Sequence, residues 1–104
     1  MLDRRVQGAL RPSPLITWAD GRHFFDLTGA TITARIRNKI NGTVRDSLGT
    51  FTVTNGAQGQ FRWDLHADDV AEAGEFEVRF TAAFGTAPTP GKSYRTDWIV
   101  EEDF

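Results

Sequence analysis

Short segments in which apolar and polar residues alternate, separated by turn signals, most constrain what this chain can fold into. Residues 31–37 place Ile32, Ala34 and Ile36 on one side and hydroxyl or arginine side chains on the other. The same alternation recurs in four later segments, at residues 49–54, 60–65, 75–84 and 93–100. Successive side chains of a strand point to opposite faces, so this period indicates strands with one buried face. The chain is therefore predicted to be all-β.

The connections between these segments carry turn and loop signals. Asn41-Gly42 follows the first strand, and this dipeptide tolerates the positive φ angles of a tight hairpin. Residues 66–74 are the one helix-tolerant stretch, but they are too few for a stable helix. We expect a single turn there, opened by an acidic cap and closed by Gly74. Residues 85–91 contain two prolines and are predicted to form a loop.

Two further segments near the N-terminus complete the predicted set of strands. Residues 15–18 follow a proline-rich stretch, and residues 3–7 are predicted to form a short edge strand. About seven short strands with turns every 8–12 residues are typical of a β-sandwich, and a small closed barrel is the alternative. A chain of 104 residues is long enough for one core. Residues 1–104 are therefore interpreted as a single domain, with frayed ends at 1–5 and 102–104.

Bulky residues of the alternating segments define the predicted core. Those in phase with apolar neighbours, expected to lie between two sheets, are Ile36, Phe61, Trp63, Phe76, Val78, Phe80 and Trp98. If they were exposed, Trp18, Trp63 and Trp98, with the phenylalanines, could form a sugar-binding platform. Tryptophans at inward positions more often belong to the core. Burial of all three would favour a structural domain over a carbohydrate-binding one.

Charge is distributed unevenly along the sequence. Residues 1–52 carry eight Lys or Arg against four Asp, a net +4, and residues 53–104 carry four against ten Asp or Glu, a net −6. One interpretation is that the halves interleave in the sandwich and their fields largely cancel. The other is that complementary faces meet between copies in a weak, salt-sensitive homo-oligomer or ring. The candidate interaction surface then comprises Arg35, Arg37, Lys39 and Arg45 with Glu72, Glu75 and Glu77.

Residues that usually carry chemistry are scarce or badly spaced. The chain has no cysteine, which excludes disulfides and cysteine-based zinc sites. His23 and His66 lie far apart in no ligand-spaced pattern, and no serine lies in a Gly-x-Ser-x-Gly elbow. We therefore expect no enzymatic activity, no cofactor and no bound metal.

Other partner classes also lack a signal. No run of basic residues is interleaved with aromatics, as nucleic-acid binding would require. No apolar run approaches the roughly 20 residues of a membrane-spanning helix, and the N-terminus lacks the apolar core of a signal peptide. We expect no nucleic acid, no membrane, and synthesis in the cytoplasm.

Two stretches resemble known protein families. Residues 69–78 have an acid and Ala-Gly before an aromatic that opens a strand, and they resemble the corner of immunoglobulin-like domains. Phe76 stands where a tyrosine supplies the corner hydroxyl. The string Asp-Leu-Thr-Gly-Ala-Thr-Ile-Thr-Ala-Arg-Ile-Arg at residues 26–37 is more specific, and it resembles the N-terminal domain family of phage baseplate upper proteins. The segments that add to this resemblance are residues 7–8, 19–21, 92–94 and 98–102.

The resemblance covers nearly the whole chain, and it implies an immunoglobulin-like antiparallel β-sandwich from a tailed-phage virion. It implies a non-enzymatic structural or assembly protein, a tail or baseplate component of a bacteriophage or prophage that docks onto other virion proteins. An adaptor, a decoration protein and a prophage remnant all fit this description. A carbohydrate- or peptide-binding sandwich module is the alternative from a different functional class.

Overall fold

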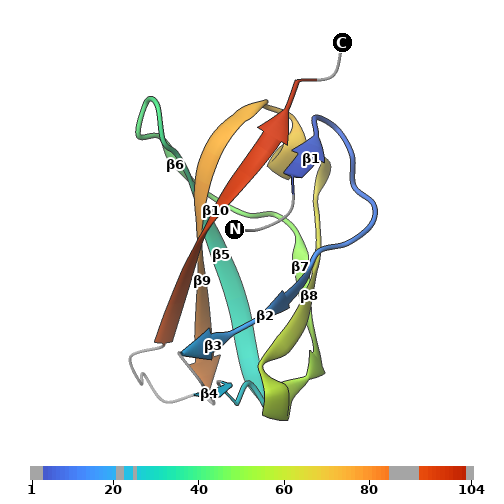
Figure 1. Ribbon diagram of the computed structural model, residues 1–104, viewed down its shortest axis with the longest axis vertical. Helices are drawn as coiled ribbons and strands as arrows, with labels where there is room; N and C mark the ends of the chain where they lie inside the picture. Colours follow the sequence, from blue (N-terminus) through green and yellow to red (C-terminus); the bar gives the residue numbers. More distant parts are fainter. Residues whose placement is uncertain (1–3, 21–22, 25, 85–91, 103–104) are drawn as a thin grey trace.

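The computed structural model describes residues 4–20, 23–24, 26–84 and 92–102, and these residues form an all-β fold (Figure 1). The strands are β1 Arg4–Val6, β2 Leu15–Thr17, β3 Ala19–Asp20, β4 His23–Phe24, β5 Ala30–Asn38, β6 Val44–Asp46, β7 Thr50–Asn55, β8 Gln60–Asp64, β9 Gly74–Phe84 and β10 Lys92–Glu101. Two 3-10 turns, η1 Gly56–Gln58 and η2 Ala67–Val70, follow β7 and β8. The loop predicted at 85–91 and the chain ends at 1–3 and 103–104 lie outside the described residues.

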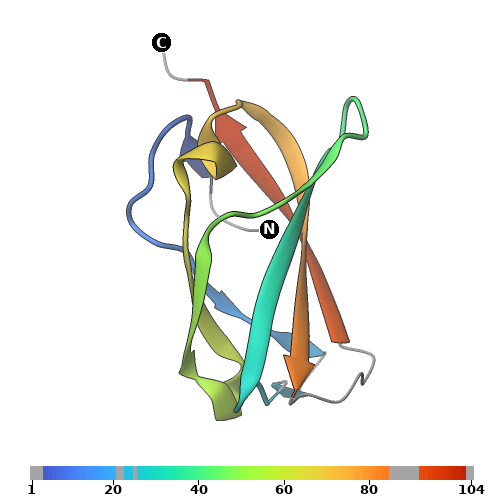
Figure 2. The ribbon, with the colours of Figure 1, turned by 180° about the vertical axis from the view of Figure 1, so that it is seen from behind.

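The strands form two main sheets, arranged as the layers of a sandwich (Figures 1 and 2). The larger sheet has the order β1-β10-β9-β5-β6 and the smaller one the order β2-β8-β7, while β3 pairs with β4. Both sheets are open, which agrees with the predicted β-sandwich and not with a closed barrel.

Two details of the predicted sheets are wrong. β1 runs parallel to β10, with Arg5 opposite Val100, so the larger sheet is mixed rather than antiparallel. The N–H of Gln7 extends this pairing to the carbonyl of Glu101 at 2.7 Å. The described residues form ten strands rather than about seven; the additional ones are β3 and β4, of two residues each, and β6, the short return strand that can follow the Asn41-Gly42 turn. Alternation cannot be recognised over so few positions.

The predicted core is confirmed. All seven predicted residues are buried, each with at most 2% of its surface exposed. The Trp63 ring lies 5.1 Å from that of Trp98 and 5.5 Å from that of Phe80, edge-on to the latter. Trp18 is also buried, at 4% exposed. All three tryptophans therefore belong to the core, and Phe51 packs against it from the partly buried face of β7.

The turn after β8 differs from the prediction in its cap. His66 caps η2, because its Nδ1 accepts the N–H of Asp68 at 3.1 Å. The Asp69 carboxylate reaches back to accept the N–H of His66 at 3.0 Å, so the acid lies inside the turn rather than before it. This reciprocal arrangement is a capping box. Gly74 is the first residue of β9, and the turn itself ends at Val70.

Candidate interaction surface

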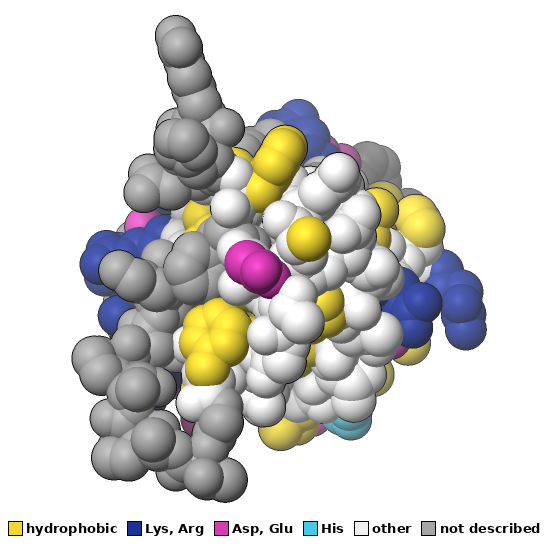
Figure 3. All heavy atoms as spheres, turned by 90° about the horizontal axis from the view of Figure 1, so that it is seen from below, with side chains coloured by type: hydrophobic (Ala, Val, Ile, Leu, Met, Phe, Trp, Pro, Cys, Tyr) yellow, Lys and Arg dark blue, Asp and Glu magenta, His cyan; other side chains and the backbone are white. Residues whose placement is uncertain are grey.

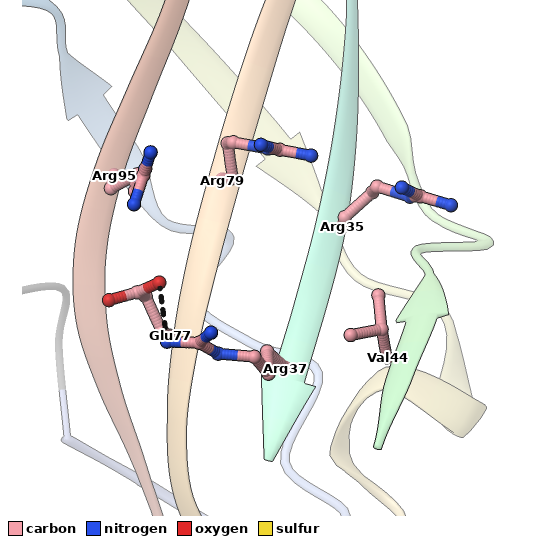
Figure 4. Close-up of a pocket in the computed structure, with 6 residues that line it drawn as sticks. All are labelled: Arg35, Arg37, Val44, Glu77, Arg79 and Arg95. Carbon is pink, nitrogen blue, oxygen red and sulfur yellow. Dashed lines mark hydrogen bonds and ion pairs between the residues drawn. The ribbon is translucent and has the colours of Figure 1, made fainter. Parts of the chain in front are cut away.

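The outer face of the larger sheet carries part of the predicted basic surface. Arg35 and Arg37 are exposed on β5 because they alternate with the buried Ala34 and Ile36. β9 pairs with β5 on one side and with β10 on the other. The register therefore arranges the outward side chains of three strands in rows across the sheet (Figure 4).

The row that contains Arg37 holds charges of both signs. Arg37 is opposite Glu77, which is opposite Asp97. Arg37 Nη2 lies 3.2 Å from Glu77 Oε1, and Lys39 Nζ lies 2.7 Å from Asp97 Oδ1. The hydrogen bond between Lys39 and Asp97 raises the pKa of the lysine and lowers the pKa of the aspartate. These groups are largely solvated, so each pair contributes little stability.

Glu72, Glu75 and Arg45 are the remaining residues of the predicted surface. Glu72 accepts a hydrogen bond from Asn38 Nδ2 at 3.3 Å, and Glu75 is exposed on β9. Arg45 on β6 pairs with the buried Asp69, at 3.4 Å. Since β5 and β9 are neighbours, the predicted basic and acidic sets adjoin one another. This corresponds to the interpretation in which the charges interleave within one molecule.

The next row across the sheet is entirely basic. Arg35, Arg79 and Arg95 lie opposite one another on β5, β9 and β10, and we call them the arginine row (Figure 4). Two of its members, Arg79 and Arg95, are absent from the surface predicted from the sequence. The alternation of β9 and β10 does show that both point outward. That they lie beside Arg35 depends on the register of strands far apart in the sequence, which no local pattern reveals.

The end of the sandwich at the bottom of Figure 1 has a different character. Seen from there (Figure 3), its described surface is mainly uncharged, with scattered hydrophobic side chains, an acidic side chain near the centre and basic side chains toward the margins. Among the described residues, Phe24 in β4 is the one aromatic that is mostly exposed, at 56%. A single exposed ring does not form an aromatic platform for a sugar.

The described residues hold no arrangement that is typical of catalysis or metal binding. The Ser13 hydroxyl donates to Asp64 at 2.7 Å and the Ser47 hydroxyl donates to Asp69 at 2.8 Å. Both serines are thus bonded to carboxylates rather than to a histidine base. Within the described ranges, no three His, Asp or Glu side chains are grouped so that they could hold a metal ion. The same ranges contain no helix that is long and apolar enough to cross a membrane.

Asp64 makes the stability of the fold sensitive to acid. The Ser13 hydroxyl and then the Arg62 guanidinium, 3.1 Å away, lower the pKa of Asp64 below its usual 3.8. The pKa values of Asp26 and Asp97 are lowered as well. A carboxylate whose pKa is lowered by folding stabilises the fold above its usual pKa, and this contribution is lost as the pH falls through the lowered value. We expect the urea midpoint to fall on acidification from about pH 4 to about pH 2.

The variant Asp64→Asn isolates this contact. It cannot release or bind the proton, so its urea midpoint should fall less steeply over the same acid range. The neutral hydrogen bond to Ser13 can still form, which limits the loss near neutral pH. Identical acid profiles for the variant and the parent would contradict the assignment.

Comparison with known proteins provides no relative. No protein-family model, no curated protein and no solved structure matches the chain. Support for a function therefore comes from the residues and the geometry of the chain itself.

Proposed function

We propose that the chain is an immunoglobulin-like β-sandwich and a non-enzymatic structural or assembly protein of a tailed bacteriophage or prophage. It is a tail or baseplate component of the virion, made in the bacterial cytoplasm, and it works by docking onto other virion proteins. It uses no cofactor.

The strand order supports the immunoglobulin-like part of the proposal. In such domains, strands C, F and G are neighbours in one sheet, and strands B, E and D are neighbours in the other. Here β5, β9 and β10 stand in the first set of positions and β2, β8 and β7 in the second, with chain order preserved. Phe76 lies near the start of β9, where the corner aromatic of strand F is expected.

The turn before β5 contains most of the Asp-Leu-Thr-Gly-Ala-Thr string, and the resemblance to phage baseplate upper proteins depends chiefly on that string. The Asp26 carboxylate accepts the N–H of Thr28 at 2.9 Å, and Gly29 adopts a φ of 78°. Leu27 is fully buried, and its carbonyl accepts the N–H of Ala30 at 2.9 Å. Short polar side chains that bond the turn backbone, followed by a glycine with positive φ, are a physical reason for this string.

Burial of the tryptophans supports a docking role over carbohydrate binding. Trp18, Trp63 and Trp98 have at most 4% of their surfaces exposed. Their rings are therefore not accessible to a sugar. The outer face of the five-stranded sheet, the sheet with the most strands, is instead charged, which suits contact with another protein.

The proposal predicts that the protein is a component of phage particles. Particles released by the bacterium that encodes the chain would be purified, and their tails separated from the capsids. Mass spectrometry should find the chain in the tail fraction, because a tail or baseplate component stays attached during purification. The neighbouring genes should encode tail, tape-measure or baseplate proteins. Particles without the chain would contradict the proposal, and selective binding to a glycan array would favour the alternative.

A further inference from the structure

We propose that the arginine row binds a short acidic segment of a partner protein through its carboxylates. The inference deepens the proposed docking function. It rests on that function in one respect, namely that the partner is a protein. It identifies the face that docks and the chemistry that this face recognises.

The arginine row lines a hollow on the outer face of the sheet (Figure 4). The hollow has a volume of about 170 Å³, and Arg37, Glu77 and Val44 complete its lining. Val44, on the edge strand β6, is 48% exposed. Guanidinium groups match carboxylates with paired, parallel hydrogen bonds, and an apolar wall beside them can contact the methylene groups of an acidic side chain.

Two charges of the row are not neutralised within the described chain. Arg35 Nε lies 3.1 Å from Asp46 Oδ1, on the neighbouring strand. Arg79 and Arg95 have no acidic partner among the described residues. Like charges directly opposite each other on neighbouring strands destabilise a sheet. An anion bound to the row removes this repulsion, so binding should also stabilise the fold.

The neighbouring rows limit the size of the anion. On one side of the arginine row lie Arg37, Glu77 and Asp97, and on the other lie the uncharged Thr33 and Thr81. Three strands spaced about 4.8 Å apart make a row about 10 Å long. Carboxylates on alternate residues of an extended segment are about 7 Å apart, so two of them fit the row. A long polyanion such as a nucleic acid would extend over the next row, where Glu77 and Asp97 already pair with Arg37 and Lys39.

The acidic segment is more readily supplied by another protein than by a second copy of this chain. Most described acidic side chains already have a partner within the molecule. These are Asp46, Asp64, Asp69, Glu72, Glu77, Asp97 and Glu101. With these side chains a second copy would reach the arginine row only by breaking such pairs, which leaves Asp68, Glu75 and Glu102 for that contact.

Binding of a fluorescent hexaglutamate peptide to the whole chain tests the inference, with hexaglutamine as the uncharged comparison. Fluorescence anisotropy at low salt should show saturable binding of hexaglutamate alone. The affinity should fall steeply between about 0.05 M and about 0.5 M salt, because added ions screen exposed charges. Peptide binding does not require phage particles, so this result and the particle test can fail independently.

Arg79→Gln is the decisive variant, and Arg62→Gln is its matched control. Each removes one exposed positive charge, but Arg62 lies on β8 in the other sheet, bonded to Asp64. Arg79→Gln should weaken hexaglutamate binding about tenfold, whereas Arg62→Gln should leave it nearly unchanged. Arg79→Gln should melt no lower than the parent, because it removes a like-charge neighbour of both other arginines. Weaker binding would then not be a result of unfolding.

Three results would overturn the inference. The first is absence of hexaglutamate binding at low salt, and the second is equal weakening by the two variants. The third is a different occupant, shown in either of two ways. An oligothymidylate of equal charge that binds more tightly than hexaglutamate would indicate nucleic acid. Self-association at low salt that Arg79→Gln abolishes would indicate a second copy of the chain.

Discussion

Truncation of Trp63 to alanine is expected to lower the free energy of unfolding by about 3–5 kcal/mol. The side chain is fully buried, and its ring contacts those of Trp98, Phe80 and Phe51 between the two sheets. Its removal leaves a cavity that side chains from both sheets cannot easily fill. A small domain has a total stability of only about 5–15 kcal/mol, so the loss is a large share of it.

Thermal unfolding measures this effect directly. A loss of about 3 kcal/mol lowers the melting temperature of a domain of this size by about 12 °C or more. Ile40→Ala is the control, because Ile40 is 82% exposed in the connection between β5 and β6. It should change the stability by less than about 0.5 kcal/mol. Similar melting temperatures for Trp63→Ala and the parent would contradict the central place of Trp63 in the core.

Replacement of Asp69 by alanine is expected to cost about 2–4 kcal/mol, although Asp69 is charged and lies in a short turn. Its carboxylate is fully buried and accepts hydrogen bonds from Ser47 Oγ at 2.8 Å and from the N–H of His66 at 3.0 Å. It also accepts a hydrogen bond from the N–H of Leu48 at 3.3 Å and pairs with Arg45. Alanine would leave these donors without their acceptor. Arg45 is partly exposed and can still reach water, which keeps the expected cost below that of a fully buried pair.

Asp68→Ala is the matched control for Asp69. The two aspartates are adjacent in η2, but the Asp68 side chain is 69% exposed, and its carboxylate lies 3.7 Å from His66 Nδ1. Urea unfolding of Asp68→Ala should give a free energy within about 0.5 kcal/mol of the parent. Equal losses for the two variants would mean that the turn needs acidic residues for their charge alone, not Asp69 for its hydrogen bonds.

The contrast between these neighbours shows where sequence analysis stops. The cluster of acids after β8 indicates a capped turn, and a capped turn is what forms. The sequence does not distinguish the exposed aspartate from the buried one. Asp69 is buried because β6 and the segment after it pack over η2, where Arg45 and Ser47 reach its carboxylate. Those partners are more than twenty positions away along the chain.

The sequence by itself determined which residues form the long strands, which face of each strand is buried, and where glycine permits a turn. Ile36, Trp63 and Phe80 are all buried as their alternation predicts, because the direction of a strand side chain depends only on its position in the strand. The tertiary structure alone decided which strands are neighbours and in what register. It set β1 parallel to β10, and it placed Arg79 between Arg35 and Arg95. Backbone hydrogen bonds are the same whichever strand is the partner, so they do not determine which two strands pair. These pairings therefore depend on the packing of the whole sandwich.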